Sequence, residues 1–209
     1  MKIGILGGGN VGGTLGERWA QAGHEIFFGV RNPDAAEMKE TIGRCGGRAS
    51  AGSVNQAAAF GDVIVNALPW AAAKSALPAL DLKGKVLLDA ANPILPDFSG
   101  LEIGTTSSGG ELVAQLAAGA KVVKIFNTTG FKNMGNPVIQ GTKIPIFYCG
   151  DDSAAKSTAA QLAADLGFEP IDAGPLSNAR LLEPHAFLWI WLALKGGLGR
   201  DFAFQIVKR

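Results

Sequence analysis

Short apolar runs alternate with amphipathic stretches along the first half of the chain. The runs are rich in Ile, Val and Leu and are bounded by Gly, Pro or polar residues, which is typical of strands buried on both faces. Strands are predicted at residues 3–6, 25–30, 62–67 and 85–90. Helical spacing of the apolar positions predicts helices at residues 11–22, 33–42 and 70–80. The alternation favours an α/β fold, with a mostly parallel sheet and helices on both of its faces.

The second half of the chain begins with a stretch without this periodicity. Residues 92–106 are rich in Pro, Gly and small polar side chains, as expected of a loop over the carboxyl ends of the strands. Ser108 and Glu111 then fit a capping box that starts a helix through Ala118. Further strands are predicted at residues 122–126, 144–149 and 169–172. Further helices are predicted at residues 154–166 and 177–195.

Composition narrows the class of ligand. The chain has 209 residues, 18% charged residues and a formal net charge of +1, so it lacks the surplus of positive charge that drives binding to nucleic acid or anionic membranes. The longest clean apolar run, residues 186–194, is about half the roughly 20 residues of a membrane-spanning helix. Cys45 and Cys149 have neither disulfide-framework nor metal-site spacing, and no targeting signal is visible. We expect one cytoplasmic domain that binds a small molecule and no metal.

A GxGxxG motif lies between the first predicted strand and the first predicted helix. In this context Gly7 permits a tight turn, Gly9 lets the backbone approach a phosphate, and Gly12 lets the helix pack close to the strand. The free N–H groups at the start of the helix, around Asn10 and Val11, would face the anion. The motif predicts a site for a dinucleotide pyrophosphate.

The end of the second predicted strand indicates which dinucleotide is bound. NAD-preferring enzymes of this type usually place Asp or Glu there, whereas this chain has Val30, Arg31 and Asn32 and no carboxylate before Asp34. A guanidinium can hold a 2′-phosphate through charge-assisted bonds of roughly 1.5 to 3 kcal/mol. We therefore predict NADP as the cofactor; the alternative is that Arg31 is an ordinary solvated side chain.

Polar and proline residues follow two other predicted strands. Ala67, Leu68 and Pro69 form one tip, and Asn92 and Pro93 form the next. Ligands of open α/β sheets lie at the carboxyl ends of the strands, so both tips are predicted to border the pyrophosphate and the nicotinamide. Alternatively, the prolines only shape turns.

A substrate pocket is predicted on the same side of the sheet. Trp70 follows the first of these tips, and Asn127 and Thr128 form the polar end of the strand at residues 122–126. His24 lies in a turn and is interpreted as structural. His185 lies on the apolar C-terminal helix, where a core or interface role is commoner than that of a general acid. No catalytic acid or base is visible.

Several segments together resemble one known family. They are residues 4–12, 68–70, 126–128, 149–152 and, most specifically, the run 172–183 with the sequence DAGPLSNARLLE. These residues resemble the deazaflavin (coenzyme F-420)-dependent NADP oxidoreductases over nearly the whole chain.

The resemblance implies a doubly wound Rossmann-type NADP-binding domain at residues 1–173. It also implies a small C-terminal helical part at residues 174–209, which completes the substrate pocket through Ser177 and Asn178 and contributes to a homodimer. Arg31 and Asn32 would hold the adenosine phosphate, while Val30 replaces a Ser that is typical of the family. The implied reaction is hydride transfer between NADP(H) and a deazaflavin or flavin stacked on the nicotinamide, for which positioning residues suffice.

Other functions remain open. The same outline occurs in NADPH-using ferric reductase domains. Hydroxyacid dehydrogenases share the opening loop, but they carry a catalytic Lys nine residues after the first Gly of a later motif, where this chain has Glu183. A carboxylate cannot stabilise a developing alkoxide as an ammonium would. A further alternative is a non-catalytic NADP sensor that recruits a partner through the helix at residues 181–194. Its apolar stripe of Phe187, Trp189, Trp191 and Leu194 more often buries itself in a homodimer.

Overall fold

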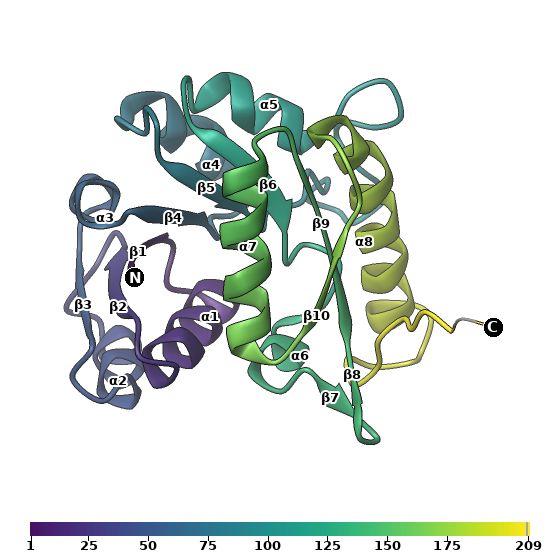
Figure 1. Ribbon diagram of the computed structural model, residues 1–209, viewed down its shortest axis with the longest axis horizontal. Coiled ribbons are helices and arrows are strands. Elements are labelled where there is room, and N and C mark those ends of the chain that lie inside the picture. Colours follow the sequence, from purple (N-terminus) through teal and green to yellow (C-terminus); the bar gives the residue numbers. More distant parts are fainter. Residues whose placement is uncertain (208) are drawn as a thin grey trace.

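The computed structural model describes residues 1–207 and 209 (Figure 1). Its centre is an eight-stranded sheet in the order β10-β9-β6-β5-β4-β1-β2-β3. The strands of this sheet are β1 (Lys2–Leu6), β2 (Glu25–Gly29), β3 (Ala49–Gly52), β4 (Val63–Asn66), β5 (Val86–Asp89), β6 (Lys121–Ile125), β9 (Pro145–Gly150) and β10 (Glu169–Asp172). All neighbouring strands pair in parallel except β6 and β9, which are antiparallel. The mostly parallel α/β fold predicted from the sequence is confirmed.

Helices cover both faces of this sheet, as Figure 1 shows. The helices are α1 (Asn10–Gln21), α2 (Ala36–Arg44), α3 (Val54–Phe60), α4 (Trp70–Ala76), α5 (Gly109–Leu116), α6 (Phe131–Gly135), α7 (Ser153–Leu166) and α8 (Ala179–Leu194), with 3-10 turns η1 (Leu77–Ala79) and η2 (Leu176–Asn178). The two main apolar cores lie under α1, α2 and α7 and under α3, α4 and α5, and a small third cluster lies under the start of α8. Alternate residues of the strands fill the two cores, because side chains point to opposite faces along a strand.

The strand pattern missed one βα unit. Residues 49–60 carry no run of Ile, Val and Leu, yet they form β3 and α3 between the second and third predicted strands. Strand β3 is made of Ala, Ser and Gly and pairs with β2 at the edge of the sheet, where it needs few large side chains. A capping box between Ser53 and Gln56 starts α3.

Element ends differ from the predictions where proline or a local hydrogen bond intervenes. Helix α2 begins at Ala36 rather than at Pro33, because the Asp34 amide donates to Asn32 Oδ1 at 3.2 Å and forms a turn first. The helix predicted through residue 80 gives way to η1 near Pro78. Helix α6 and a small hairpin of β7 (Val138–Ile139) and β8 (Thr142–Lys143) were not predicted.

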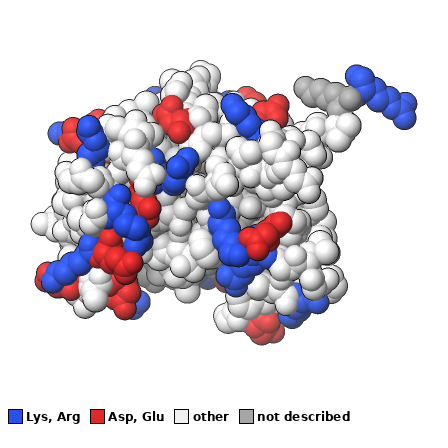
Figure 2. Space-filling view, turned by 90° about the horizontal axis from the view of Figure 1, so that it is seen from below, with Lys and Arg blue, Asp and Glu red and all other residues white. Residues whose placement is uncertain are grey.

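Two properties of the described part of the chain bear on its partners. None of its helices is both long and apolar enough to cross a membrane. On the face seen in Figure 2, basic and acidic side chains are interspersed rather than gathered into one broad patch of a single sign.

Candidate functional site

The glycine loop connects β1 to α1 through backbone that excludes side chains. Gly7 has a φ of +101°, and a Cβ there would lie 2.8 Å from the Ala67 carbonyl oxygen. A Cβ on Gly12 would overlap the Gly7 carbonyl oxygen. By contrast, a Cβ on Gly9 would meet no atom within 4 Å, so open space lies beside the loop. The loop therefore has no room for a side chain where Gly7 and Gly12 face the protein, whereas the space beside Gly9 is open.

The first turn of α1 presents donors without acceptors. Its N-cap is Gly9, which provides no side-chain cap, and no acidic residue lies in the first turn. The Gly13 amide makes the first bond of the helix, to the Gly9 carbonyl oxygen at 2.7 Å. The amides of Asn10, Val11 and Gly12 precede this bond and have no acceptor within the helix. The positive end of the helix dipole is thus available to an anion.

Two exposed polar side chains follow the end of β2. Arg31 and Asn32 are both exposed, and Arg31 makes no ion pair with the residues that the structure describes. The carboxylate of Asp34 faces Lys39 instead, at 3.5 Å. Val30 is half-buried, and a Cβ on Gly8 would touch its side chain. Among the described residues, no carboxylate neutralises the guanidinium of Arg31.

The tips of β5 and β6 are joined by two asparagines. Asn92 Nδ2 donates to the Asn127 carbonyl oxygen at 2.9 Å, and Asn127 Nδ2 donates to Asn92 Oδ1 at 3.1 Å. Pro93 is buried beside this pair. At the tip of β4, Ala67 and Leu68 are half-buried and Pro69 is the exposed N-cap of α4.

A cavity of about 260 Å³ lies between the tips of β5 and β6 and the C-terminal helix. We call it the central cavity. It is lined by Val11, Ala90, Asn92, Phe98, Phe126, Asn127, Thr129, Gly130, Phe131, Lys132, Met134, Trp189, Ile190, Leu194 and Arg200. It starts at the first turn of α1, passes the tips of β5 and β6, and ends on aromatic side chains. Of the predicted site residues, Val11, Asn92 and Asn127 meet there.

Four predicted substrate residues lie outside the lining of the central cavity. Trp70 is buried and donates through Nε1 to Glu102 Oε2 at 2.9 Å, so it anchors the loop that follows β5. Thr128 is buried beside Asn127. Ser177 is exposed in η2, and Asn178 Nδ2 donates to the Ala173 carbonyl oxygen at 2.5 Å.

One of the strained backbone positions lies at the end of β6. Phe126 is fully buried and has a φ of +67°, in the left-handed region that bulky residues rarely adopt. Its ring packs edge-on against Trp19, with 5.6 Å between centroids, and against Phe168. This packing holds the turn that leads into Asn127. Such strain is commonly retained at binding sites.

Asn127 has a buried acceptor without a partner. Its Nδ2 also donates to the Leu182 carbonyl oxygen at 3.3 Å, and because a carbonyl can only accept, this contact fixes the orientation of the amide. Asn127 Oδ1 is buried and makes no hydrogen bond to the described residues. An unpaired buried acceptor costs about 1 to 3 kcal/mol, so a ligand N–H at this point would stabilise the site.

A buried ion network lies behind the central cavity, and sequence reasoning missed it. It consists of Asp89 at the end of β5, Lys124 in β6 and Glu183 in α8, all fully or almost fully buried. Lys124 Nζ lies 2.8 Å from Asp89 Oδ2 and 2.8 Å from Glu183 Oε1, and it donates to the Ala91 carbonyl oxygen at 2.5 Å. Burial alone would lower the pKa of Lys124, but the two carboxylates outweigh it and raise this pKa, so the ammonium stays charged.

Glu183 connects the network to the start of α5. Its two carboxylate oxygens accept from the backbone amides of Gly109 and Gly110 at 2.8 and 2.9 Å. A carboxylate at a helix N-terminus also interacts favourably with the helix dipole. The residue in the place of the dehydrogenases' catalytic Lys therefore fixes α8 to the sheet. The signal in the sequence was a lysine inside an apolar strand, which requires a buried partner.

The histidines and cysteines lie outside the central cavity. His185 packs between Phe147 and Phe204, and burial lowers its pKa, which favours the neutral imidazole. His24 Nε2 lies 3.1 Å from Asp165 Oδ2 on α7, a structural contact. Cys149 is buried, which raises the pKa of its thiol to about 12. Within residues 1–207 and 209, no three His, Cys, Asp or Glu side chains are grouped so that they could hold a metal ion.

The doubly wound sheet, the open glycine loop and the cavity at the strand tips define a Rossmann-type, dinucleotide-dependent oxidoreductase. A family model described as "NADP oxidoreductase coenzyme F420-dependent" matches residues 2–93. A crystal structure described as a candidate F420-dependent NADP reductase from Arthrobacter sp. FB24 is 32% identical, with a TM-score of 0.90 and complete coverage of both chains. The chain belongs to the family of coenzyme F420-dependent NADP oxidoreductases.

Two curated relatives differ in how much of their length this chain matches. The F420-dependent NADP reductase of Methanothermobacter thermautotrophicus is 29% identical over 198 residues, which cover 88% of this chain and 85% of that protein. The rat metalloreductase STEAP3 is 31% identical over 183 residues, which cover 87% of this chain but 36% of that protein. The chain thus spans about a third of the metalloreductase. NADPH-bound reductive aminases from Aspergillus terreus, at 22% identity and a TM-score of 0.68, share the fold.

Proposed function

We propose that this chain transfers a hydride between NADP(H) and a flat deazaflavin- or flavin-like ring that binds in the central cavity. One observation carries the proposal: the central cavity reaches from Val11, in the first turn of α1, to the aromatic wall formed by Phe131 and Trp189. A nicotinamide that enters from the glycine loop and a second ring can therefore lie in contact within one apolar space. Two relatives described as F420-dependent NADP reductases support the same pair of substrates.

The residues of the nucleotide side fit NADP. The amides of Asn10, Val11 and Gly12 would bind the pyrophosphate beside the open face of Gly9. Arg31 and Asn32, next to Val30, would bind the 2′-phosphate.

The strand tips would surround the nicotinamide half of the cofactor. Ala67, Leu68 and Pro69 would border it on one side, and Asn92 and Pro93 on the other. The unpartnered Asn127 Oδ1 suits an amide N–H, which the nicotinamide carboxamide supplies.

The cavity supports hydride transfer without a general acid or base. When bound, NADPH supplies the hydride and the acceptor ring takes it, so the chain has to align the two rings at contact distance and exclude water. Gly130 lets the Trp189 indole pack against the backbone that follows β6, because a Cβ at residue 130 would collide with the indole. The lining is mainly apolar, and its titratable side chains are Lys132 and Arg200 at the rim.

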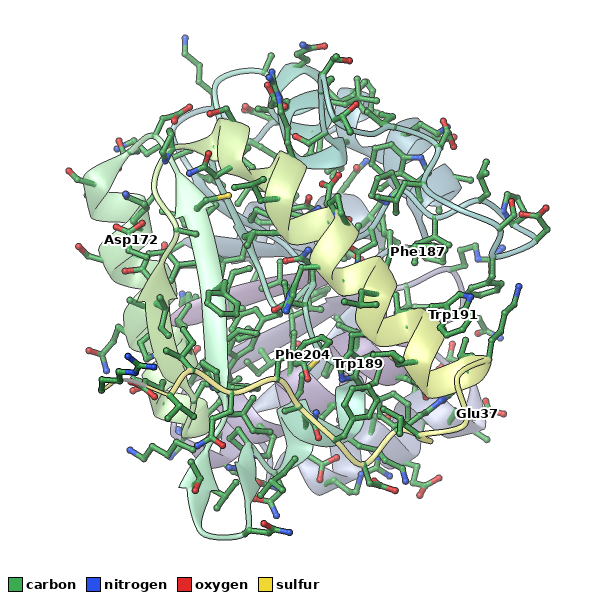
Figure 3. The ribbon with its side chains drawn as sticks, turned by 90° about the vertical axis from the view of Figure 1, so that its right-hand side faces the viewer. Glu37, Asp172, Phe187, Trp189, Trp191 and Phe204 are labelled. Carbon is green, nitrogen blue, oxygen red and sulfur yellow. The ribbon has the colours of Figure 1, made fainter. Side chains whose placement is uncertain are left out.

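We also propose that the exposed face of α8 pairs with a second copy of the chain. Leu181, Leu188, Trp191 and Leu194 of α8 are each at least 46% exposed, as is Leu198 just after the helix. Trp189 belongs to the opposite side of α8, where it stacks on Phe202, with 5.2 Å between centroids, and Figure 3 shows it turned away from Trp191. The stripe that the sequence assigned to one interface is therefore divided. We expect Leu188→Glu to convert a dimer to a monomer in sedimentation analysis, whereas a monomeric wild type would contradict the proposal.

A steady-state assay of NADPH oxidation separates the candidate functions. We expect turnover with 5-deazaflavins or FMN. Turnover with ferric complexes alone would favour a ferric reductase, and turnover with small carbonyls alone would favour a hydroxyacid-type enzyme. Tight NADPH binding without turnover of any acceptor would overturn the proposal in favour of a sensor.

A further inference from the structure

A row of buried polar side chains crosses the sheet near the carboxyl ends of the neighbouring strands β4, β5 and β6 (Figure 1). Asn66 of β4 is the register partner of Asp89 of β5, and Asp89 is the register partner of Lys124 of β6. All three side chains are fully buried. Because side chains at paired positions of parallel strands point to the same face of a sheet, the three lie side by side.

Hydrogen bonds join the members of this row. Asn66 Nδ2 donates to Asp89 Oδ1 at 2.8 Å, and Lys124 Nζ donates to Asp89 Oδ2 at 2.8 Å. A carboxylate can only accept, so the contact with Asp89 fixes the orientation of the Asn66 amide and leaves its Oδ1 as an acceptor. The Leu68 amide donates to that oxygen at 3.4 Å. Asn66 therefore links the tip of β4 to the buried ion network.

The tip of β5 is held by the same network. The Ala91 amide donates to Asp89 Oδ1 at 3.2 Å, and the Ala91 carbonyl oxygen accepts from Lys124 Nζ at 2.5 Å. The residues on either side of it, Ala90 and Asn92, line the central cavity. Asp89 Oδ1 is thus shared between the tips of β4 and β5.

The ion network is a rigid support for both tips. Lys124 Nζ lies 2.8 Å from Asp89 Oδ2 and 2.8 Å from Glu183 Oε1. Separating any of these charges would leave an uncompensated ion in the core, so the three side chains keep one arrangement. Through this arrangement the spacing between Leu68 and Asn92, at the two tips, is also fixed.

We propose that Asn66 is a positioning residue for hydride transfer, which couples the tip of β4 to the ion network and so fixes the gap that holds the nicotinamide. Asn66 lies outside the lining of the central cavity and acts through Leu68 and Asp89. The proposal rests on the proposed function, because it takes the tips of β4 and β5 as the two borders of the nicotinamide. A misplacement of about 1 Å can slow a reaction by about 100-fold, so loss of this link should affect rate more than affinity.

Two substitutions separate the link to Asp89 from the local turn of the backbone. Asn66→Ala removes both hydrogen bonds of the side chain. Asn66→Ser keeps a hydroxyl that can accept from the Leu68 amide but is too short to reach Asp89. Asn66→Ser also perturbs the core less, so it decides the test if Asn66→Ala does not fold.

The rate constant of hydride transfer is measured by stopped flow, in a single turnover of the NADPH-loaded protein with saturating 5-deazariboflavin. Slower transfer from NADPH deuterated at C4 shows that the observed step is the hydride transfer itself. NADPH affinity is measured by titration calorimetry. We expect both variants to transfer the hydride about tenfold more slowly than the wild type and to bind NADPH with nearly unchanged affinity.

His24→Ala is the matched control, because it removes a buried polar contact at the opposite end of the sheet. His24 precedes β2, and its Nε2 lies 3.1 Å from Asp165 Oδ2. This variant should lower the melting temperature and keep the wild-type rate constant of hydride transfer.

Several outcomes would overturn the inference. A wild-type rate constant in Asn66→Ala, or in Asn66→Ser alone, overturns it while the proposed function stands. An equal slowing in His24→Ala also overturns it, because the rate would then follow stability. Weaker NADPH binding with an unchanged rate at saturation assigns Asn66 to affinity and overturns it as well. Absence of hydride transfer in the wild type overturns the proposed function and the inference with it.

Discussion

The two sides of the candidate site are built in different ways. On the nucleotide side, the contiguous residues 7–12 form a glycine-rich loop. This loop offers backbone amides without helical acceptors and has no room for side chains at Gly7 and Gly12. On the acceptor side, side chains from β6, α6, α8 and the C-terminal segment converge, and a buried ion network fixes the helix behind them. The nucleotide side therefore depends on local backbone geometry, whereas the acceptor side depends on contacts between residues distant in sequence. Changes to one side should leave the other largely intact.

The largest effect is expected from removing the charge at the centre of the network. Lys124→Met leaves Asp89 and Glu183 buried without a counter-ion, which should lower the free energy of unfolding by about 3 to 5 kcal/mol in urea titrations. Lys121→Met, in the same strand, removes an exposed pair with Asp152 and should cost less than about 1 kcal/mol. Equal and small losses for both variants would contradict the role assigned to the network.

The matching change on the nucleotide side is Gly12→Ala. Its Cβ overlaps the Gly7 carbonyl oxygen, so α1 must move from β1, at a cost of roughly 1 to 3 kcal/mol. NADPH affinity, measured by titration calorimetry, should fall, while the exposed face of α8 is unaffected. Gly43→Ala in α2 is the control, because its Cβ meets no atom within 4 Å. If both variants bind NADPH like the wild type, the tight loop is not what positions the pyrophosphate.

A smaller and more selective effect is expected at Arg31. Arg31→Ala should reduce the preference for NADPH over NADH about tenfold, because we propose that the exposed guanidinium pairs with the 2′-phosphate, which NADH lacks. Affinities for the two nucleotides give the ratio directly. Lys39→Ala, on the neighbouring helix α2, is the control, and an unchanged ratio in Arg31→Ala would remove the basis for the NADP assignment to this residue.

The smallest effect is expected at the ion pair between Glu111 of α5 and Arg180 of α8. Hydrogen bonds from Arg180 hold the pKa of Glu111 below its ordinary value of 4.5. A lowered pKa means that the ion pair stabilises the fold above this value and that the contribution is lost as the pH falls through the folded pKa. Between pH 5 and pH 3 the melting temperature of the wild type should therefore fall more than that of Glu111→Gln. Parallel curves would show that the pair contributes nothing.

The same contrast explains what the sequence could predict. The glycine loop, the strands that flank it and Arg31 lie within the first 31 residues, so local spacing was enough to locate them. Lys124 and Asp89 are 35 residues apart and Glu183 is 74 residues from Gly109, so no local pattern joined them. Strand β3 was missed because an edge strand of small residues carries no apolar run. Trp189 and Trp191 were predicted on one face, although Phe202 buries the first.

The central claim is that a hydride passes directly from NADPH to a flat ring in the central cavity. A single-turnover reaction with NADPH deuterated at one face of nicotinamide C4, followed by mass spectrometry and NMR of the reduced 5-deazaflavin, tests it directly. Direct transfer predicts that the deuterium from one of the two C4 diastereomers is recovered at C5 of the acceptor. Reduced acceptor that contains only solvent hydrogen with both diastereomers, or no reduction at all, would contradict the claim.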